Sequence, residues 1–193
     1  EDTLVVYASD NGPDSAHYPV VSSSGPFRGY LGSAYEGSIR TPLVVRWPGR
    51  VAAGTSTNEI VSIVDLFPTL VGIGGAEVPD DRAIDGVDLQ GLWRGERDRS
   101  GRAHVLVFSG RTLLAVKWHQ FKIFFTGDDP AARDRAWRRL WAPLVYYVVR
   151  DAREEVDITS DNLWLLQPSF REVMKFLFSV EDEGIVMPGG EKP

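Results

Sequence analysis

The sequence contains no cysteine among its 193 residues. It therefore has no disulfide framework, no thiolate metal site and no cysteine nucleophile. No apolar run approaches the ~20 residues that span a bilayer, so we expect no membrane span. An excess of basic residues is also missing, because 27 acidic and 21 basic side chains give a net charge of −6. That balance argues against a nucleic-acid partner or an acidic membrane surface.

The residues that are present have an ordinary globular composition, with 43% hydrophobic and 25% charged residues. The length suits one good-sized domain or part of a larger one. The chain starts at Glu1 with neither a methionine nor a signal peptide, and it enters an apolar strand almost at once. We therefore expect it to be the C-terminal part of a longer chain.

The apolar, β-branched stretch over residues 3–9 is typical of a buried strand in a parallel sheet, and Asp10-Asn11-Gly12 follows it directly. Ligands of open α/β sheets bind at the carboxyl ends of strands. Asp10 and Asn11 offer two neighbouring oxygen ligands of the kind that Ca²⁺ and Mg²⁺ prefer. Gly12 lets the backbone turn sharply and leaves room for a ligand. The same tripeptide is also a common turn, so a turn without metal stays open.

A long loop and then one strand and two helices are predicted after the first strand. Residues 12–38 are rich in Gly, Ser and Pro and lack periodicity, which predicts a long loop of the kind that usually carries function. Hydrophobic spacing then predicts a strand and two helices, over residues 42–47, 63–73 and 88–95. Asp65 is expected to cap or charge the first turn of the longer helix.

The sequence changes character after residues 100–102. Three β-rich runs joined by two-residue polar turns predict antiparallel hairpins, over residues 104–109, 112–118 and 121–126. A fourth strand is expected at residues 145–149, and residues 128–142 as an exposed helix or an ordered loop. The last helix is expected over residues 162–181, with an apolar face formed by Phe170, Val173, Met174 and Leu177.

These elements predict an α/β protein in two parts. Residues 1–100 form the end of a mixed sheet with flanking helices, and residues 101–193 form a small four-stranded antiparallel sheet packed with a C-terminal helix.

Five stretches in the first part give the chain a resemblance to a known family. In order, they are Val5-Val6-Tyr7-Ala8-Ser9-Asp10-Asn11-Gly12-Pro13, Pro26-Phe27-Arg28-Gly29, Tyr35-Glu36-Gly37-Ser38-Ile39-Arg40-Thr41-Pro42, Arg46-Trp47-Pro48-Gly49 and the pair Val64-Asp65-Leu66-Phe67-Pro68-Thr69-Leu70 and Ile84-Asp85-Gly86-Val87-Asp88. Together they resemble the C-terminal half of the sulfatase family, arylsulfatase-like members of the alkaline-phosphatase-like superfamily. The resemblance is strongest over residues 3–95 and only general after residue 128.

The resemblance implies hydrolysis of sulfate esters of small molecules or sugars. Such enzymes use a formylglycine made from cysteine or serine, with a divalent ion, usually calcium, holding the sulfate. Asp10 and Asn11 match the family's second pair of metal ligands. The bound ion would polarise the sulfuryl oxygens and stabilise charge as the ester bond breaks.

Other parts of that machinery are missing from the sequence. It has no Cys-x-Pro-x-Arg or Ser-x-Pro-x-Arg stretch, and Asp80-Asp81 reads as solvated surface. By the resemblance, the nucleophile, a first aspartate pair and the assisting histidines all lie upstream. We therefore expect the chain alone to have no turnover, because the nucleophile lies upstream and His17 is the one catalytic candidate that the sequence offers.

One departure concerns the contact to the sulfate. Many arylsulfatases have a lysine four residues before the aromatic residue of the Tyr-Glu-Gly motif, and here that position is Leu31. Arg28 or Arg40 would supply a cation nearby, since arginine binds oxyanions well. The alternative is that these arginines hold a loop by bonding backbone carbonyls or a carboxylate such as Glu36. The departure also leaves open a phosphate or phosphonate ester as substrate.

His17, in the long loop, is a candidate general acid, with an exposed loop histidine as the alternative. His104 and His119 lack a metal-binding pattern and are read as structural. Three functions stay open: part of a sulfatase, part of a phosphate or phosphonate ester hydrolase, and a non-catalytic interaction domain that retains the fold. The Asp10-Asn11 pair argues against the third.

Overall fold

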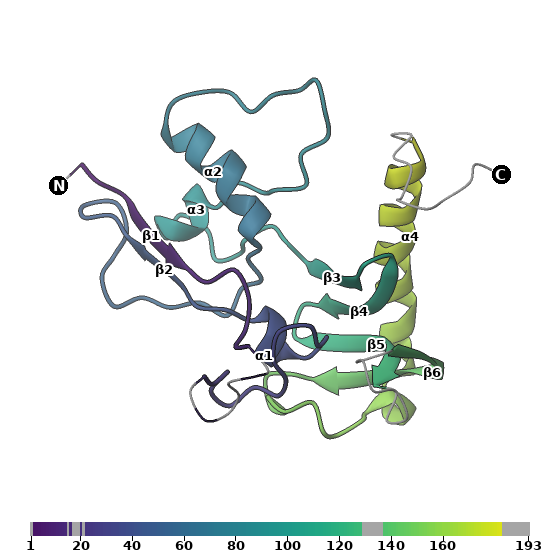
Figure 1. Cartoon of the computed structure of the whole chain (residues 1–193). Coiled ribbons are helices and arrows are strands. Elements are labelled where there is room, and N and C mark those ends of the chain that lie inside the picture. The colour runs from purple at the N-terminus through teal and green to yellow at the C-terminus, as the bar shows by residue number, and fades with distance from the viewer. Residues whose placement is uncertain (1, 15, 17–19, 21, 129–136, 183–193) are drawn as a thin grey trace. The chain divides into compact units, whose positions relative to one another are not determined.

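The structure is a computed structural model of the chain, and it describes residues 2–14, 16, 20, 22–128 and 137–182 (Figure 1). Two compact units make up the chain. The first contains residues 1–11 and 41–105, and the second contains residues 12–40 and 106–193. The domain boundary expected at residue 100 stays a prediction. No helix in these ranges is both long and apolar enough to cross a membrane.

The first unit opens with strand β1 (Val5–Ala8), which pairs antiparallel with β2 (Leu43–Arg46). The prediction of a buried strand in a parallel sheet is therefore wrong for the part of the chain that the structure describes. Val5 and Tyr7 on β1 are 47% and 63% exposed. An apolar β-branched run predicts a strand, but it carries no information about the direction of its partner. A two-stranded ribbon also leaves its faces open where no second layer packs on it.

The helices of the first unit follow the predicted spacing. A 3-10 turn, η1 (Ile63–Asp65), leads into α2 (Leu66–Ile73). Ser62 and Asp65 form a capping box at the start of η1, which is the first turn of the predicted helix. The predicted role of Asp65 at the helix start is thus confirmed. The short helix predicted at residues 88–95 is the single turn α3 (Gln90–Trp93).

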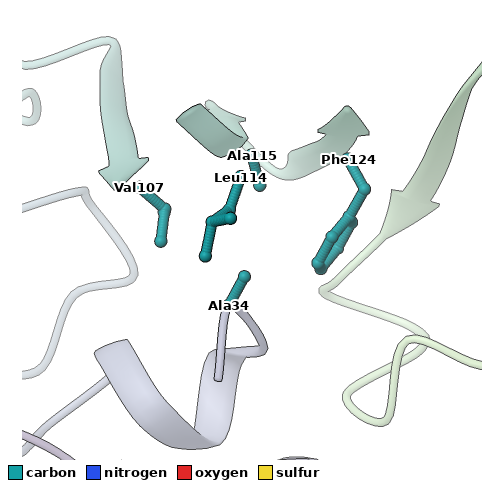
Figure 2. Packing of buried hydrophobic residues seen from close by; sticks show 5 residues of the cluster. All are labelled: Ala34, Val107, Leu114, Ala115 and Phe124. Atoms are coloured by element: carbon teal, nitrogen blue, oxygen red, sulfur yellow. The ribbon is translucent and has the colours of Figure 1, made fainter. Parts of the chain in front are cut away.

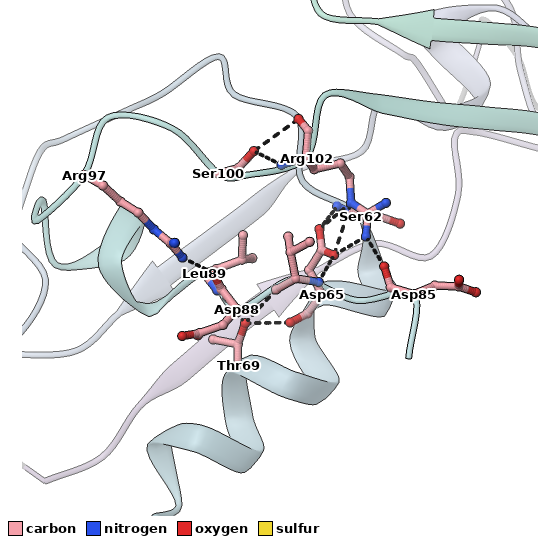
Figure 3. A network of polar contacts seen from close by, with 10 residues as sticks. Ser62, Asp65, Thr69, Asp85, Asp88, Leu89, Arg97, Ser100 and Arg102 are labelled. Carbon is pink, nitrogen blue, oxygen red and sulfur yellow. Dashed lines mark hydrogen bonds and ion pairs between the residues drawn. The ribbon is translucent and has the colours of Figure 1, made fainter. Parts of the chain in front are cut away.

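Asp65 also joins two of the motifs noted in the sequence (Figure 3). Its fully buried carboxylate accepts hydrogen bonds from the backbone N–H groups of Ser62 and Val87, at 2.7 and 2.8 Å. Arg102 donates to the same carboxylate through Nε, at 2.9 Å, and through Nη2. Nη2 of Arg102 also donates to the carbonyl of Asp85, at 2.7 Å. The two motifs are therefore held together by one saturated carboxylate.

The second unit is built on a four-stranded sheet in the order β3-β4-β5-β6, formed by β3 (His104–Ser109), β4 (Thr112–Trp118), β5 (Phe121–Asp128) and β6 (Trp137–Tyr147). The β4–β5 and β5–β6 pairs are antiparallel. The predicted α/β class, with a small antiparallel sheet and a C-terminal helix, is confirmed.

The prediction for residues 128–142 is wrong where the structure describes them. Residues 137–142 belong to β6, and Arg138 and Arg139 pair with Gly127 and Thr126 of β5. Trp137 and Trp141 are four residues apart in the sequence, which suggests a helical period. Pairing with β5 decides the conformation instead. Residues 129–136 lie outside the described part of the chain.

The sheet packs on both faces. One face meets Ala34 and Tyr35, just before the short helix α1 (Glu36–Ile39), and Figure 2 shows Ala34 directed toward Leu114 and Phe124. The other face packs Val116, Ile123 and Val145 against Leu165 and Val173. Residues 34–39 and the C-terminal helix therefore lie on opposite sides of the sheet.

The C-terminal helix begins later than expected. Two 3-10 turns, η2 (Thr159–Asp161) and η3 (Leu163–Leu165), precede α4 (Leu166–Asp182). Of the predicted apolar face, Val173 is buried, whereas Phe170, Met174 and Leu177 are 43–47% exposed. The period was predicted correctly, but only part of the face packs on the sheet.

Candidate functional site

Asp10 and Asn11 lie just beyond the end of β1, in the first unit. The Asn11 N–H donates to Oδ1 of Asp10, at 2.9 Å, and the Ser9 hydroxyl donates to the Asn11 carbonyl, at 3.0 Å. The side chain of Asp10 is exposed. The chain therefore bends at residues 10–12, where the tripeptide predicts a turn, and the role of Asp10 and Asn11 as metal ligands stays a prediction.

The donor chemistry of this pair fits part of a calcium site. A carboxylate and an amide supply hard oxygens, but Ca²⁺ takes roughly six to eight of them. Within the described ranges, no group of three or more His, Cys, Asp or Glu side chains is arranged to hold a metal ion. By their chemistry, Asp10 and Asn11 could supply two of the ligands that such a site requires.

Gly12 serves a purpose that the sequence did not indicate. It is not among the glycines with positive φ. A Cβ at this position would lie 1.9 Å from the carbonyl oxygen of Gly37, and the Gly12 N–H donates to the carbonyl of Ser38, at 2.8 Å. The backbone of Gly37 and Ser38 occupies the space where a side chain of residue 12 would lie. That space is therefore not available to a ligand.

The Pro-Phe-Arg-Gly and Tyr-Glu-Gly motifs pack against each other in the second unit. The Gly37 N–H donates to the carbonyl of Arg28, at 2.7 Å, and a Cβ on Gly37 would meet that oxygen at 2.5 Å. Gly29 has a φ of 94°, and a side chain there would clash with Ser33 and Tyr35. The glycines in these motifs therefore allow close approach of two backbone segments.

Arg28 and Arg40 are placed by reciprocal stacking. The Arg28 guanidinium lies 4.0 Å from the ring centroid of Tyr35, and that of Arg40 lies 4.6 Å from the ring centroid of Phe27. Arg28 also donates to a backbone carbonyl, that of Glu154, at 3.3 Å. Arg40 forms a 3.8 Å ion pair with Glu36. These are the loop-holding contacts of the alternative interpretation, and the arginines' role toward a substrate stays a prediction.

The other positions noted in the sequence are three histidines and Leu31. His17 lies outside the described residues. His104 starts β3, and His119 occupies the β4–β5 turn with a φ of 50°. Leu31 is 42% exposed and its N–H donates to the carbonyl of Pro13, at 2.8 Å. The metal-ligand pair belongs to the first unit, and Arg28 and Arg40 belong to the second.

Comparison with known proteins decides the family. The family model described as Sulfatase matches residues 1–76. Human steryl-sulfatase (Homo sapiens) is 31% identical over 94% of this chain and 35% of its own length. The crystal structure of PsFucS1 sulfatase from Pseudoalteromonas sp. superposes with a TM-score of 0.82 and 25% identity, over 97% of this chain and 38% of that one. The chain belongs to the sulfatase family.

The part of the sulfatase fold that this chain spans is limited. Steryl-sulfatase of Mus musculus is 40% identical over 61% of this chain, but that match covers 20% of the mouse protein. The chain thus spans between a fifth and two fifths of the length of these relatives. Asp10, Asn11, Arg28 and Arg40 all fall within the residues that the sulfatase model matches.

This sulfatase chain also contains a buried charged cluster that sequence reasoning missed, formed by Glu36, Lys117, Lys122 and Glu154. Nζ of Lys122 lies 3.3 Å from Oε1 of Glu36 and 3.1 Å from Oε1 of Glu154, and all three side chains are fully buried. Lys117 donates to Oε2 of Glu36. One signal was available. Lys117 and Lys122 are equally distant from the His119-Gln120 turn, so a two-residue hairpin places them opposite each other.

The cluster shifts the pKa values of its members in different directions. Burial acts to raise the pKa of Glu36, but the charges of Lys122 and Lys117 outweigh it and hold that pKa below its usual value. Burial raises the pKa of Glu154, and Lys122 only partly opposes it. Burial likewise lowers the pKa of Lys117, against the attraction of Glu36. Glu36 is therefore the carboxylate that the lysines stabilise most.

Proposed function

We propose that this chain is the C-terminal part of a sulfatase that hydrolyses sulfate esters, contributing two metal ligands and an arginine-bearing segment. The observation that carries the proposal is the Asp10-Asn11 pair at the end of β1, in the region that the family model matches. The relatives named above are sulfatases. A degenerate interaction domain would have no need for two oxygen ligands at the end of a strand.

Asp10 and Asn11 would hold the calcium or magnesium ion by their side-chain oxygens. When bound, such an ion supplies a Lewis acid that polarises the oxygens of the ester. The chain has no cysteine and no Ser-x-Pro-x-Arg stretch. The proposal therefore places the formylglycine nucleophile outside these residues, and the 193-residue chain alone has no turnover.

Arg28 and Arg40 are the proposed contacts to the anionic ester. Each guanidinium lies over an aromatic ring, which restrains its position, and arginine binds oxyanions through paired N–H donors. One structure of similar fold, at 21% identity, is that of BT4656 in complex with its substrate D-glucosamine-2-N,6-O-disulfate. The relatives include N-acetylgalactosamine-6-sulfatase of Canis lupus familiaris. The substrate class proposed here is a sulfated sugar or a small-molecule sulfate ester.

The second candidate function keeps the superfamily and changes the substrate to a phosphate or phosphonate ester. Leu31 favours it, because leucine neither donates to nor neutralises an anion at the position where the resemblance to arylsulfatases implies a lysine. Asp10 and Asn11 do not discriminate between the two esters, since both need the same type of ion.

The test uses the protein encoded by the complete reading frame, assayed on an aryl sulfate and on the matching aryl phosphate. We expect hydrolysis of the sulfate, strongly reduced at limiting calcium by Asp10→Ala and by Asn11→Ala. Asp80→Ala is the matched control, because Asp80 is an exposed acid in a turn segment, and it should leave the activity unchanged. Preference for the phosphate would favour the second candidate. Equal activity of Asp10→Ala and the control would overturn the proposed metal ligands.

A further inference from the structure

We propose that three members of the buried cluster, Glu36, Lys122 and Glu154, position Arg28 and Arg40. Through these arginines they set how tightly the anionic ester binds. The inference rests on the proposed function, in which the two arginines contact that ester. All three side chains are fully buried, so in this proposal each acts through the arginines as a positioning residue.

The sheet creates the need for Glu36. Lys117 and Lys122 are register partners on neighbouring strands, and like charges directly opposite each other repel. They lie on the face that Ala34 and Tyr35 cover, and Glu36 follows next in the chain. Its carboxylate meets both ammonium groups, one on each oxygen. The lysine pair therefore fixes where α1 begins on the sheet.

Glu154 provides the second connection. Its Oε2 accepts the backbone N–H of Glu36 at 2.7 Å, and its backbone carbonyl accepts from Nη1 of Arg28 at 3.3 Å. Its Oε1 forms the 3.1 Å ion pair with Lys122 but has no partner in hydrogen-bond geometry. The residue adopts a φ of 53°, which a non-glycine residue keeps only when its surroundings hold it there. One residue thus contacts the start of α1, Lys122 and Arg28.

One residue therefore separates each candidate arginine from Lys122. Arg40 reaches it through the Glu36 carboxylate, and Arg28 reaches it through the backbone of Glu154. Replacing a buried ion cluster by apolar side chains is often neutral or stabilising, so stability alone is a weak reason for one. Counted together, the four basic groups of Lys117, Lys122, Arg28 and Arg40 exceed the two acidic groups of Glu36 and Glu154. The excess charge is positive, which is the sign that an anionic ester requires.

The experiment compares Lys122→Met, Glu154→Ala and Glu154→Gln in the protein from the complete reading frame. Lys122→Met and Glu154→Ala should raise KM for an aryl sulfate about ten-fold or more, in line with loss of a charge-assisted hydrogen bond, with kcat changed much less. Glu154→Gln keeps an oxygen that accepts the Glu36 N–H, so its KM should stay near that of the unmodified protein. Lys175→Met is the control, because Lys175 pairs with Glu172 on α4 and is 64% exposed.

A purely structural role would give a different pattern. The variants would then lose kcat in proportion to the folded fraction, with KM unchanged and no rescue by Glu154→Gln, and this result would overturn the proposal. If the unmodified protein hydrolyses no sulfate ester, the proposed function fails, and amide hydrogen exchange decides the positioning role separately. Exchange at residues 28–40 should rise in Lys122→Met and Glu154→Ala but not in Glu154→Gln. Equal exchange in all variants would contradict it.

Discussion

Two buried carboxylates organise the two units of this chain, and they do so in different ways. Asp65 in the first unit is saturated by two backbone N–H groups and Arg102 (Figure 3). Glu36 in the second unit faces two lysines and an arginine. The Asp65 network is balanced and self-contained. The Glu36 cluster is connected to both candidate substrate-binding arginines, and positive charge is in excess once Arg28 and Arg40 are counted with it, so it is the one that bears on function.

The strongest test of this contrast removes the carboxylate of Asp65. Asp65→Ala leaves Arg102 without its charge partner, removes the capping box and orphans two backbone donors, so we expect a loss of about 4 kcal/mol in the free energy of unfolding. Urea unfolding measures it. Asp85→Ala is the control, because Arg102 contacts the carbonyl of Asp85 and its side chain is exposed. Similar losses in both variants would show that Asp65 is not the centre of the network.

A somewhat smaller loss of stability is expected for Lys122→Met, about 3 kcal/mol, because breaking a buried pair leaves uncompensated charge. Adding Glu154→Gln removes one of the two stranded carboxylates. The double variant should therefore recover part of the loss, and a double-mutant cycle in urea quantifies the coupling. Strictly additive effects would mean that Lys122 and Glu154 do not act as a pair.

The smallest expected effect is on the pH dependence of stability. The folded-state pKa of Glu36 is below its ordinary value of 4.5, so its contribution is present above pH 4.5 and is lost as the pH falls through the folded pKa. The pKa of Glu154 is raised, so its ionisation costs stability above its folded pKa, and that cost is relieved as the pH falls toward 4.5.

The matched variants separate these two contributions. Lys117, Lys122 and Arg40 face Glu36, and Lys122 and Glu36 face Glu154. Glu36→Gln should flatten the stability profile below pH 4.5, and Glu154→Gln should flatten it above that value, as followed by thermal unfolding at a series of pH values. Identical profiles for the two variants would show that folding does not shift the pKa values of Glu36 and Glu154 in opposite directions.

Sequence reasoning succeeded where the signal is local. Strands β3 and β4 occupy the predicted residues because two-residue turns delimit them, and Asp65 acts at the start of its helix because capping depends on neighbours three positions away. Asp10 and Asn11 were singled out for their position after a strand. The direction and exposure of that strand were not predictable, because both depend on what packs beside it.

The buried cluster could not be derived in the same way. Glu36 lies 86 positions from Lys122 and its N–H contacts a side chain 118 positions away. Only the symmetric placement of Lys117 and Lys122 about a turn was visible, and it predicts a repulsion without naming the acid that relieves it. The same limit explains β6, where pairing with β5 overrode the helical spacing of Trp137 and Trp141.

The most direct test of the central claim is a metal titration of sulfate ester hydrolysis, using the protein from the complete reading frame. Hydrolysis should stop when a chelator removes divalent ions and should return on addition of calcium. Asp10→Ala should require at least ten-fold more calcium for half-maximal activity, since one of few charged ligands is lost. Hydrolysis that is insensitive to chelator, or an unchanged calcium requirement in Asp10→Ala, would contradict the assignment of Asp10 and Asn11 as metal ligands of a sulfatase.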